Sequence, residues 1–363
     1  MDLREAREVV VAPVTITPTK PLTPTHVKGL LWTDVLIRAT SLIAPTRLVW
    51  NPRLAHLTTQ TTAFWEYLDR TEPDTDWSAE GEPAIGGRYV RFHQARPPIR
   101  PRALDEYFDR VEAEGWIHPA GRRLLGLWRR EFDRLDVADP GLTADRPLTW
   151  SAGTAIRELT GRRMLIDHRR FGGPAYLDGA RWGMPIRQLI GADGHANYLL
   201  PILRELLPMI RPDRLFLLIY DDGLAADYLL LDRVLTAFGG SVARLPLSRV
   251  AIDGTVRSSR YGGWTGATLA DLSAIRGSAD QAAYRLGMRL YFVGVLDRRS
   301  RQSFRLDLLR RCVGRAARHP VPDAPDAGDA CVRVTPDGYV DPRRLTVELL
   351  GRHPKTPPKG IFG

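Results

Sequence analysis

The sequence has little cysteine: its 363 residues contain two, Cys312 and Cys331. Two cysteines are too few for a disulfide framework or for a zinc site built mainly on thiolates. We therefore expect no structural metal in this protein.

The sequence also lacks long apolar runs. No stretch reaches the length needed to cross a bilayer, and the N-terminal residues do not have the pattern of a signal peptide. We expect a cytoplasmic protein without a membrane partner. Its 44% hydrophobic and 26% charged residues are ordinary for a globular protein, and the chain is long enough to bury a large core.

Acidic residues are outnumbered by basic ones, 42 against 52, which gives a net charge of +10. A positive surplus favours a polyanionic ligand such as a nucleotide or RNA. However, arginine greatly outnumbers lysine, and an arginine-rich coding bias produces the same surplus. Charge alone therefore does not establish nucleic-acid binding.

Residues 8–38 predict a strand, a loop and a helix. The apolar run Val9–Ala12 is typical of a buried parallel strand, and the four prolines that follow exclude a helix or a central strand. From Val27 the apolar residues recur at helical spacing. The start of such a helix suits a phosphate. His26 and Lys28 lie there, although a lone histidine at a helix start is also typical of a cap.

Strands and helices alternate through much of the remaining chain. We predict strands at 46–50, 163–167, 186–190 and 214–220, helices at 54–68, 104–135, 196–207 and 225–238, and mainly helix over 266–316. Residues 174–185 are expected to be loop, and the polar run 70–87 to be an exposed linker. The alternation predicts an α/β fold with a doubly wound, mainly parallel sheet, in which ligands bind at the carboxyl ends of strands.

The stretch PTKPLTPTHVKGLLWTDVLIRA resembles the first signature of class I aminoacyl-tRNA synthetases, most closely the arginyl-tRNA synthetase form. Pro18–Leu22 matches the opening of that signature, and Thr23–His26 falls where the family has His-x-Gly-His. Asp34, Leu36 and Arg38 correspond to the end of its helix.

The stretch DGTVRSSRYGGWTGATLADL resembles the second signature, a mobile loop that closes over ATP. The matching residues are Ser258, Ser259, Arg260 and Gly262. Between the two, Gly191-Ala192-Asp193 with His195 resembles the Gly-x-Asp-(His or Gln) turn of class I enzymes. A basic surface loop and a tight turn are the alternatives for these motifs taken singly, but three motifs in the family's order are more specific than any one.

The resemblance implies ATP, accompanied by Mg²⁺, and assigns roles to individual residues. His26 and Thr23 would donate to the phosphates, Lys20 would replace the usual loop lysine, and Arg260 would close over the triphosphate. Further nucleotide contacts are implied for Thr25, Lys28, Gly191, Asp193, His195, Ser258, Ser259 and Gly262. Asp193 could instead bind the substrate amine, and Tyr176 and Asp178 are candidates for a cationic substrate side chain such as a guanidinium.

Two departures from the family pattern bear on these roles. Thr25 stands where the family has a glycine on which adenine packs, and Pro24 stiffens the same loop. The chain after the second signature is also short for an anticodon-binding domain, so we expect a stand-alone paralogue of the catalytic domain.

We therefore divide the chain into five parts: the first half of a Rossmann-like domain, a mostly helical insertion, the second half, a mobile basic loop with a helical region, and a Pro-rich tail ordered in part at best. Their boundaries are 1–70, 71–165, 166–250, 251–319 and 320–363.

Three functions are compatible with these observations. The first is an ATP-dependent ligase that makes an aminoacyl-adenylate and passes the acyl group to a small amine or hydroxyl acceptor in specialised biosynthesis. The second is a tRNA-dependent aminoacyl transferase or an enzyme that charges an atypical tRNA. The third is a non-catalytic protein that senses an amino acid or binds a partner. The oligomeric state and the amino acid stay open.

Overall fold

The computed structural model describes residues 8–138, 145–256, 258–276, 280–318, 331–335 and 337–349. The first half of the chain forms β1 (Glu8–Pro13), α1 (Pro24–Thr40), β2 (Thr46–Leu48), α2 (Arg53–His56), α3 (Thr59–Thr71), α4 (Glu82–Ala95), α5 (Pro101–Glu114), α6 (Pro119–Leu135) and α7 (Ala152–Gly161). The second half forms β3 (Leu165–Asp167), β4 (Ala175–Leu177), β5 (Arg187–Ile190), α8 (Leu199–Leu206), β6 (Arg214–Asp221), α9 (Ala225–Ala237), β7 (Ser241–Leu247), α10 (Leu269–Ser273), α11 (Gln281–Arg289), α12 (Leu306–Arg318) and α14 (Pro342–Leu349).

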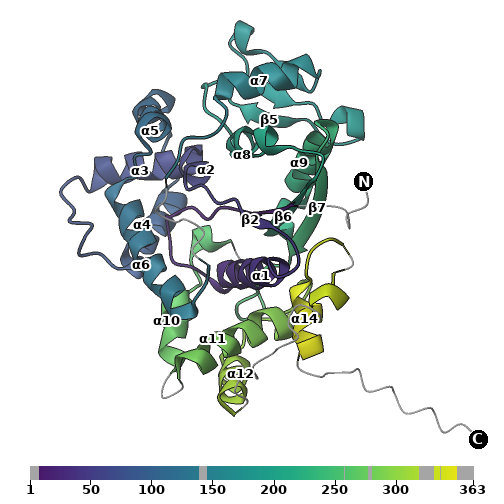
Figure 1. Ribbon diagram of the computed structural model, residues 1–363. Helices are drawn as coiled ribbons and strands as arrows, with labels where there is room; N and C mark the ends of the chain where they lie inside the picture. The colour runs from purple at the N-terminus through teal and green to yellow at the C-terminus, as the bar shows by residue number, and fades with distance from the viewer. Residues whose placement is uncertain are drawn as a thin grey trace, which may run out of the picture.

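Four parallel strands form the main sheet in the order β2-β1-β6-β7 (Figure 1). The predicted strands at 46–50 and 214–220 correspond to β2 and β6. The predicted α/β fold with a mainly parallel sheet is confirmed.

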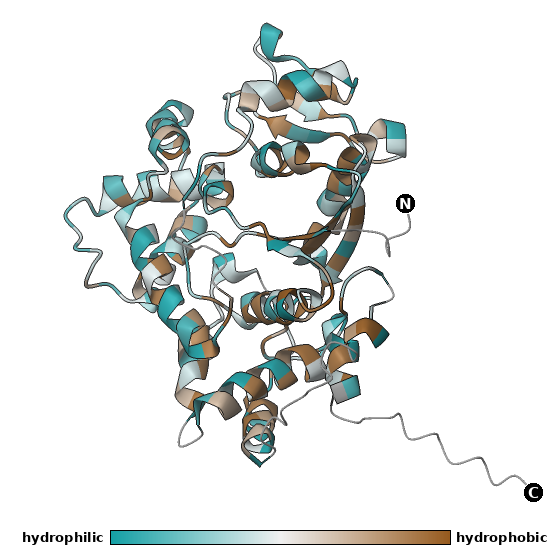
Figure 2. Cartoon of the chain, viewed as in Figure 1, coloured by the Kyte–Doolittle hydropathy of each residue, from teal (hydrophilic) through white to brown (hydrophobic). Residues whose placement is uncertain are grey.

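The main sheet lies between two cores, because successive side chains of a strand point to opposite faces. Val9 and Val11 pack in one core with α1 and the helices α3 to α6, whereas Val10 and Ala12 pack in the other with α8 and α9. Figure 2 shows apolar residues along the strands of this sheet. Burial on both faces explains why β1 and β6 are continuous apolar runs in the sequence.

A second sheet is antiparallel and has the order β3-β4-β5. Strands were predicted where β3 and β5 lie, but these pair with β4 and not with the main sheet. The prediction of loop for 174–185 is wrong at β4. A strand of three residues is too short to show an alternating pattern of its own.

The polar run 70–87 is not a linker throughout, because α4 begins at Glu82. Ile85, Tyr89 and Phe92 are all buried and form the apolar face of α4. Charged residues and glycines separate them in the sequence, so the helical pattern is difficult to recognise there. Helix α4 also packs closely on the first motif. A Cβ atom on Gly86 would lie 2.5 Å from Cδ of Pro21 and 3.2 Å from the ring of Trp264.

The C-terminal region returns to α1. Helices α10, α11 and α12, with a π-helical segment at Leu290–Val295, occupy much of the range predicted to be helical. In the tail, α14 contacts α1, and the backbone N–H of Val340 donates to Oγ1 of Thr40 at 3.1 Å. Within the described residues, no helix has the length and apolarity required to span a bilayer.

Two buried charged side chains of α1 tie it to this later part of the chain. Lys28 Nζ donates to the carbonyl oxygen and hydroxyl of Ser248 at 2.9 and 3.1 Å, and lies 3.4 Å from the Arg298 carbonyl oxygen. The carboxylate of Asp34, whose side chain is fully buried, accepts from Arg289 at 2.6 Å and from the Ala138 N–H at 2.8 Å. Since a buried charge is stable only when it is paired, these contacts define the position of α1.

Replacing Asp34 tests this anchoring. Asp34→Ala leaves the mostly buried guanidinium of Arg289 with backbone carbonyl acceptors but no carboxylate, and leaves the Ala138 N–H without its acceptor. We therefore expect the free energy of unfolding to fall by about 2–4 kcal/mol. The matched control is Arg38→Ala. Arg38 also binds Asp34, but its side chain is 48% exposed, and we expect a loss of at most about 1 kcal/mol. Urea unfolding measures both, and equal losses would contradict the anchoring role.

Candidate functional site

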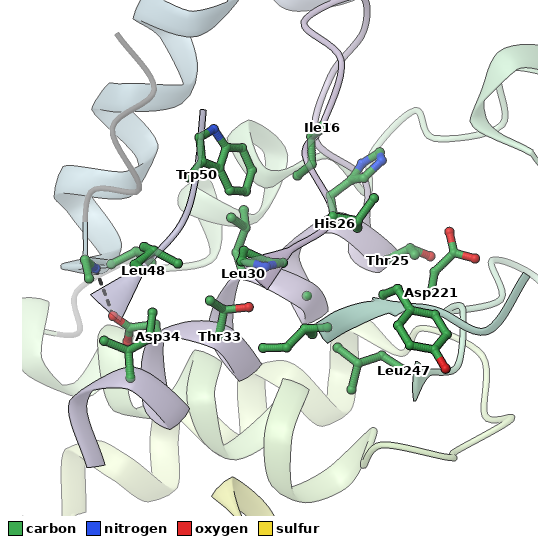
Figure 3. A pocket seen from close by; sticks show the side chains of 18 of the residues that line it. Ile16, Thr25, His26, Leu30, Thr33, Asp34, Leu48, Trp50, Asp221 and Leu247 are labelled. Atoms are coloured by element: carbon green, nitrogen blue, oxygen red, sulfur yellow. Dashed lines mark hydrogen bonds between the residues drawn. The ribbon is translucent and has the colours of Figure 1, made fainter. Parts of the chain in front are cut away.

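The carboxyl ends of all four main-sheet strands open onto one cavity, which we call the α1 crevice. Its volume is about 70 Å³, and its lining includes Pro13, Leu48, Asp221 and Leu247 from the four strand ends and His26, Gly29, Leu30, Thr33, Asp34 and Ile37 from one face of α1. Figure 3 shows His26 and Asp221 at one end of the crevice and Asp34 at the other. This is the edge at which parallel α/β sheets bind ligands.

Two further cavities adjoin the α1 crevice. The central pocket, about 440 Å³, shares Val14 with the crevice and is also lined by Asp193, His195 and Arg260. The loop cavity, about 150 Å³, shares Thr25 with the crevice and is also lined by Thr23, Pro24, Val250, Ile252, Asp253, Thr255, Ser259, Gly262, Gly263 and Trp264. The three sequence motifs therefore line adjoining cavities, although among the described residues no single cavity is lined by all three.

His26 is oriented by the start of its own helix. Nδ1 of His26 accepts from the backbone N–H of Thr23 at 3.0 Å and lies 3.1 Å from the Thr23 hydroxyl. Burial, with the charges of Lys20 and Arg249, holds the pKa of His26 well below its usual value. The imidazole is therefore neutral at pH 7, and its proton is on Nε2, which is free to donate to a ligand.

Positive charge gathers around this histidine. Burial and the nearby charge of Arg260 lower the pKa of Lys20 to about 8. Nζ of Lys20 lies 5.4 Å from the centre of the Tyr89 ring. Arg249 is held by the carboxylate of Asp221, with Nε 3.0 Å from Oδ1. In addition to burial, these positive charges lower the pKa values of Lys20 and His26, which shows that the electrostatic potential here is positive. Such a region suits an anion.

Arg260 is positioned by residues that sequence reasoning missed. Its Nη2 donates to Oε1 of Gln60 at 2.6 Å, and Nε2 of Gln60 donates to the Tyr89 hydroxyl at 2.5 Å. Gln60 belongs to α3 and Tyr89 to α4, so the helical region contacts the loop of the second motif. No sequence signal marks these two residues, because their role depends on a contact with a distant loop.

The Gly191–His195 turn has a compact internal structure. Oδ1 of Asp193 accepts from the His195 N–H at 3.1 Å, and a Cβ atom on Gly191 would lie 2.3 Å from that oxygen. A side chain at position 191 would therefore displace the Asp193 carboxylate, which folds back over the glycine. His195 stacks on Phe108 at 4.5 Å, and its Nε2 lies 2.9 Å from Oδ1 of Asp105, another residue of the helical region that the sequence did not indicate.

Thr25 does more than fill the position of the family glycine. Its Oγ1 accepts from the backbone N–H of Val250 at 3.0 Å. This contact joins the start of α1 to the segment after β7, on the border of the α1 crevice and the loop cavity.

Other predicted site residues have protein partners. All the contacts of the Lys28 ammonium described above are to protein oxygens, so a phosphate would have to displace them. Burial lowers the pKa of Lys28 to about 8.

The remaining predicted residues also have contacts within the protein. Oγ of Ser258 lies 3.5 Å from the Arg260 N–H at the start of the loop turn. Asp178 accepts from the Ala180 N–H at 3.0 Å, and Tyr176 packs edge-on against His168 in the small sheet.

The similarity of this chain to known proteins lies in its structure. No protein-family model and no curated protein matches the sequence. Among solved structures, the arginyl-tRNA synthetase of Thermus thermophilus gives a TM-score of 0.57 at 15% identity, over 84% of this chain and 61% of that chain. The arginyl-tRNA synthetase of Plasmodium falciparum gives a TM-score of 0.48 at 11% identity, over 86% and 51%. The chain spans less than two thirds of the length of either enzyme.

The chain thus has an α/β fold that resembles the class I synthetase fold, with a four-stranded parallel sheet and helical regions. At 15% identity the likeness concerns the fold. The site combines neutral and charged donors at the carboxyl ends of strands, an arrangement able to bind and stabilise negative charge.

The charge coupling between Lys20 and Arg260 can be measured directly. Arg260→Met removes a like charge, so we expect the pKa of Lys20 to rise from about 8 toward its ordinary value. Lys28, whose pKa is also about 8 but whose low value does not depend on Arg260, is the internal control and should not move. NMR titration of labelled lysine side chains gives both values. An unchanged Lys20, or an equal rise in both, would show that Arg260 does not face Lys20.

Proposed function

We propose that this protein activates an amino acid with ATP and transfers the acyl group to a small amine or hydroxyl acceptor. One observation carries the proposal: two motifs that lie far apart in the sequence, Thr23–His26 and Ser258–Gly262, meet around a single positively charged region at the carboxyl ends of the main-sheet strands. Such a region suits a triphosphate, and the fold resembles that of class I synthetases.

The reaction would proceed in two steps. A carboxylate oxygen of the amino acid attacks the α-phosphorus of ATP, and the bond between that phosphorus and the oxygen of the leaving pyrophosphate breaks. The amine or hydroxyl of the acceptor then attacks the acyl carbon, AMP leaves, and the acceptor's proton passes to solvent. Mg²⁺ enters with ATP and neutralises part of its charge.

The residues around the three cavities fit roles in the first step. The Nε2–H of His26 donates to phosphate oxygens, Lys20 and Arg260 stabilise the charge that develops on the triphosphate, and Asp193 binds the amine of the amino acid or the ribose. Ser259 and Gly262 border the loop cavity. The nucleoside would bind beside the contact between Thr25 and Val250, because that contact occupies the backbone position on which adenine packs in the family.

Pyrophosphate exchange tests the proposal. With the twenty standard amino acids supplied singly, we expect amino-acid-dependent exchange of labelled pyrophosphate into ATP. His26→Ala and Arg260→Met should each reduce the rate about 10²–10³-fold, the usual effect of removing one donor aimed at developing charge. Arg170→Met, which changes an exposed arginine of the turn between β3 and β4, is the matched control and should retain full activity.

The result can fail in two distinguishable ways. Exchange that survives both substitutions in folded variants would contradict the assigned residues. No exchange with any amino acid, together with no binding of ATP, would contradict activation altogether and would favour a non-catalytic amino acid sensor or partner-binding protein.

A second candidate function keeps a tRNA as donor or acceptor of the acyl group. Exposed arginines support it: Arg299, Arg301, Arg305, Arg310, Arg311 and Arg318 lie on and before α12, in a chain of net charge +10. Such a surface favours a polyanion.

Nuclease treatment separates the two candidates. Under the leading proposal, product formation with a small acceptor should be unchanged after ribonuclease digestion of the reaction mixture. The control is the same digestion of a tRNA charged by an unrelated synthetase, which confirms that the nuclease acts. Loss of product with the intact enzyme would establish the tRNA-dependent reaction instead.

A further inference from the structure

The central pocket is lined by apolar side chains and by a somewhat larger set of neutral polar ones. The apolar ones are Val14, Leu54, Ala55, Ala196, Ile202 and Leu224. Its hydroxyl groups and amides come from three separate regions of the chain, namely the loop after β1, the α2–α3 region and the β5–α8 region. They are Thr15, Thr17, Thr58, Thr59, Gln60, Gln188, Asn197 and Tyr198. Asp193 and Arg260 are the charged members of the described lining apart from the histidine His195.

Asp193 is therefore the one carboxylate that the described lining offers, and part of it is already used. Its Oδ1 accepts from the His195 N–H at 3.1 Å, and its Oδ2 lies 3.6 Å from Nδ1 of His195. If Asp193 binds the amine of an amino acid, no lining carboxylate is left for a second cation on the side chain.

Asp227 lies near the pocket, but its carboxylate is not available to a cationic side chain. It is 8% exposed and lies behind Tyr198, whose hydroxyl donates to it. Arg187 Nη2 donates to the same carboxylate at 2.8 Å, so the charge of Asp227 is already balanced.

The remaining charge in the pocket opposes a cationic ligand. The guanidinium of Arg260 lines the pocket and is held there by Gln60 at 2.6 Å. A second guanidinium placed nearby would lose its hydration and meet a like charge without a carboxylate partner, and both effects weaken binding.

We infer that the central pocket binds an amino acid whose side chain is neutral and hydrogen-bonding, and that it excludes arginine and other cationic amino acids. The inference rests on the proposed function and deepens it by naming the substrate class. Some lining groups, such as Gln60 and Tyr198, already have protein partners. An apolar substrate side chain would leave the Gln188 amide and the hydroxyls of Thr15 and Thr59 unpaired, and this cost favours a polar side chain.

The first experiment compares ligands of matched size on the full-length protein. Arginine is paired with citrulline, which replaces the guanidinium by a neutral ureido group, and glutamate is paired with glutamine. Pyrophosphate exchange across the standard amino acids and citrulline is combined with calorimetric titration of each of them in the presence of a non-hydrolysable ATP analogue. We expect the best ligand to be neutral and polar, and citrulline to bind at least about tenfold more tightly than arginine.

The second experiment introduces a carboxylate without changing shape. Gln188→Glu and Asn197→Asp are isosteric, and Asp at 197 keeps the acceptor that now receives the Leu199 N–H at 3.0 Å. Each should raise the affinity for arginine relative to citrulline about tenfold, because the guanidinium gains a charged acceptor. Gln302→Glu, an exposed amide outside this pocket, is the matched control and should leave the ratio unchanged.

The outcomes separate this inference from the function on which it rests. Exchange that is best with arginine, lysine, glutamate or an apolar amino acid overturns the inference and leaves ATP-dependent activation standing. An arginine-to-citrulline ratio that neither Gln188→Glu nor Asn197→Asp changes shows that the side chain does not bind in the central pocket and also overturns it. No exchange and no binding with any amino acid overturns both.

Discussion

Two buried charges on one helix hold the structure together around its site. Lys28 and Asp34 both lie on α1, and their partners, Ser248, Arg298 and Arg289, lie more than half the chain away. Because neither charge is stable in the core without its partners, the C-terminal helices must return to α1. That return brings the loop around Arg260 over the helix start, where the Leu269 N–H also donates to the Leu22 carbonyl oxygen at 2.8 Å.

The helical region after β2 takes part in the site as well as in the core. Gln60 of α3 holds Arg260, and Asp105 with Phe108, both of α5, holds His195, so residues of two different helices orient side chains of two motifs. Packing makes this possible, since α4 approaches Pro21 and Trp264 closely enough that only glycine fits at position 86. Neutral His26 and the cation Arg260 then face the cavities from fixed positions, which is how a site binds charge without reorganising.

Much of the fold could be predicted because its strongest elements show local patterns. The buried strands β1 and β6 are continuous apolar runs, and the helix start at Thr23–His26 has its proline and capping residues in sequence. The errors fall where the local pattern is weak. Helix α4 buries only three large apolar side chains, which are spaced among charged residues and glycines, and β4 is three residues long and depends on its antiparallel neighbours.

The sequence by itself determined the class of fold, and it singled out residues that line adjoining cavities, namely Thr23, Thr25, His26, Asp193, His195, Ser259, Arg260 and Gly262. Only the tertiary structure decided what each residue can still bind. It gave Lys28 protein acceptors, turned Asp178 toward a backbone N–H, and paired Asp227 with Arg187. The physical reason is that a motif specifies residue types along a segment, whereas hydrogen-bond partners and local charge come from groups that folding brings from elsewhere in the chain.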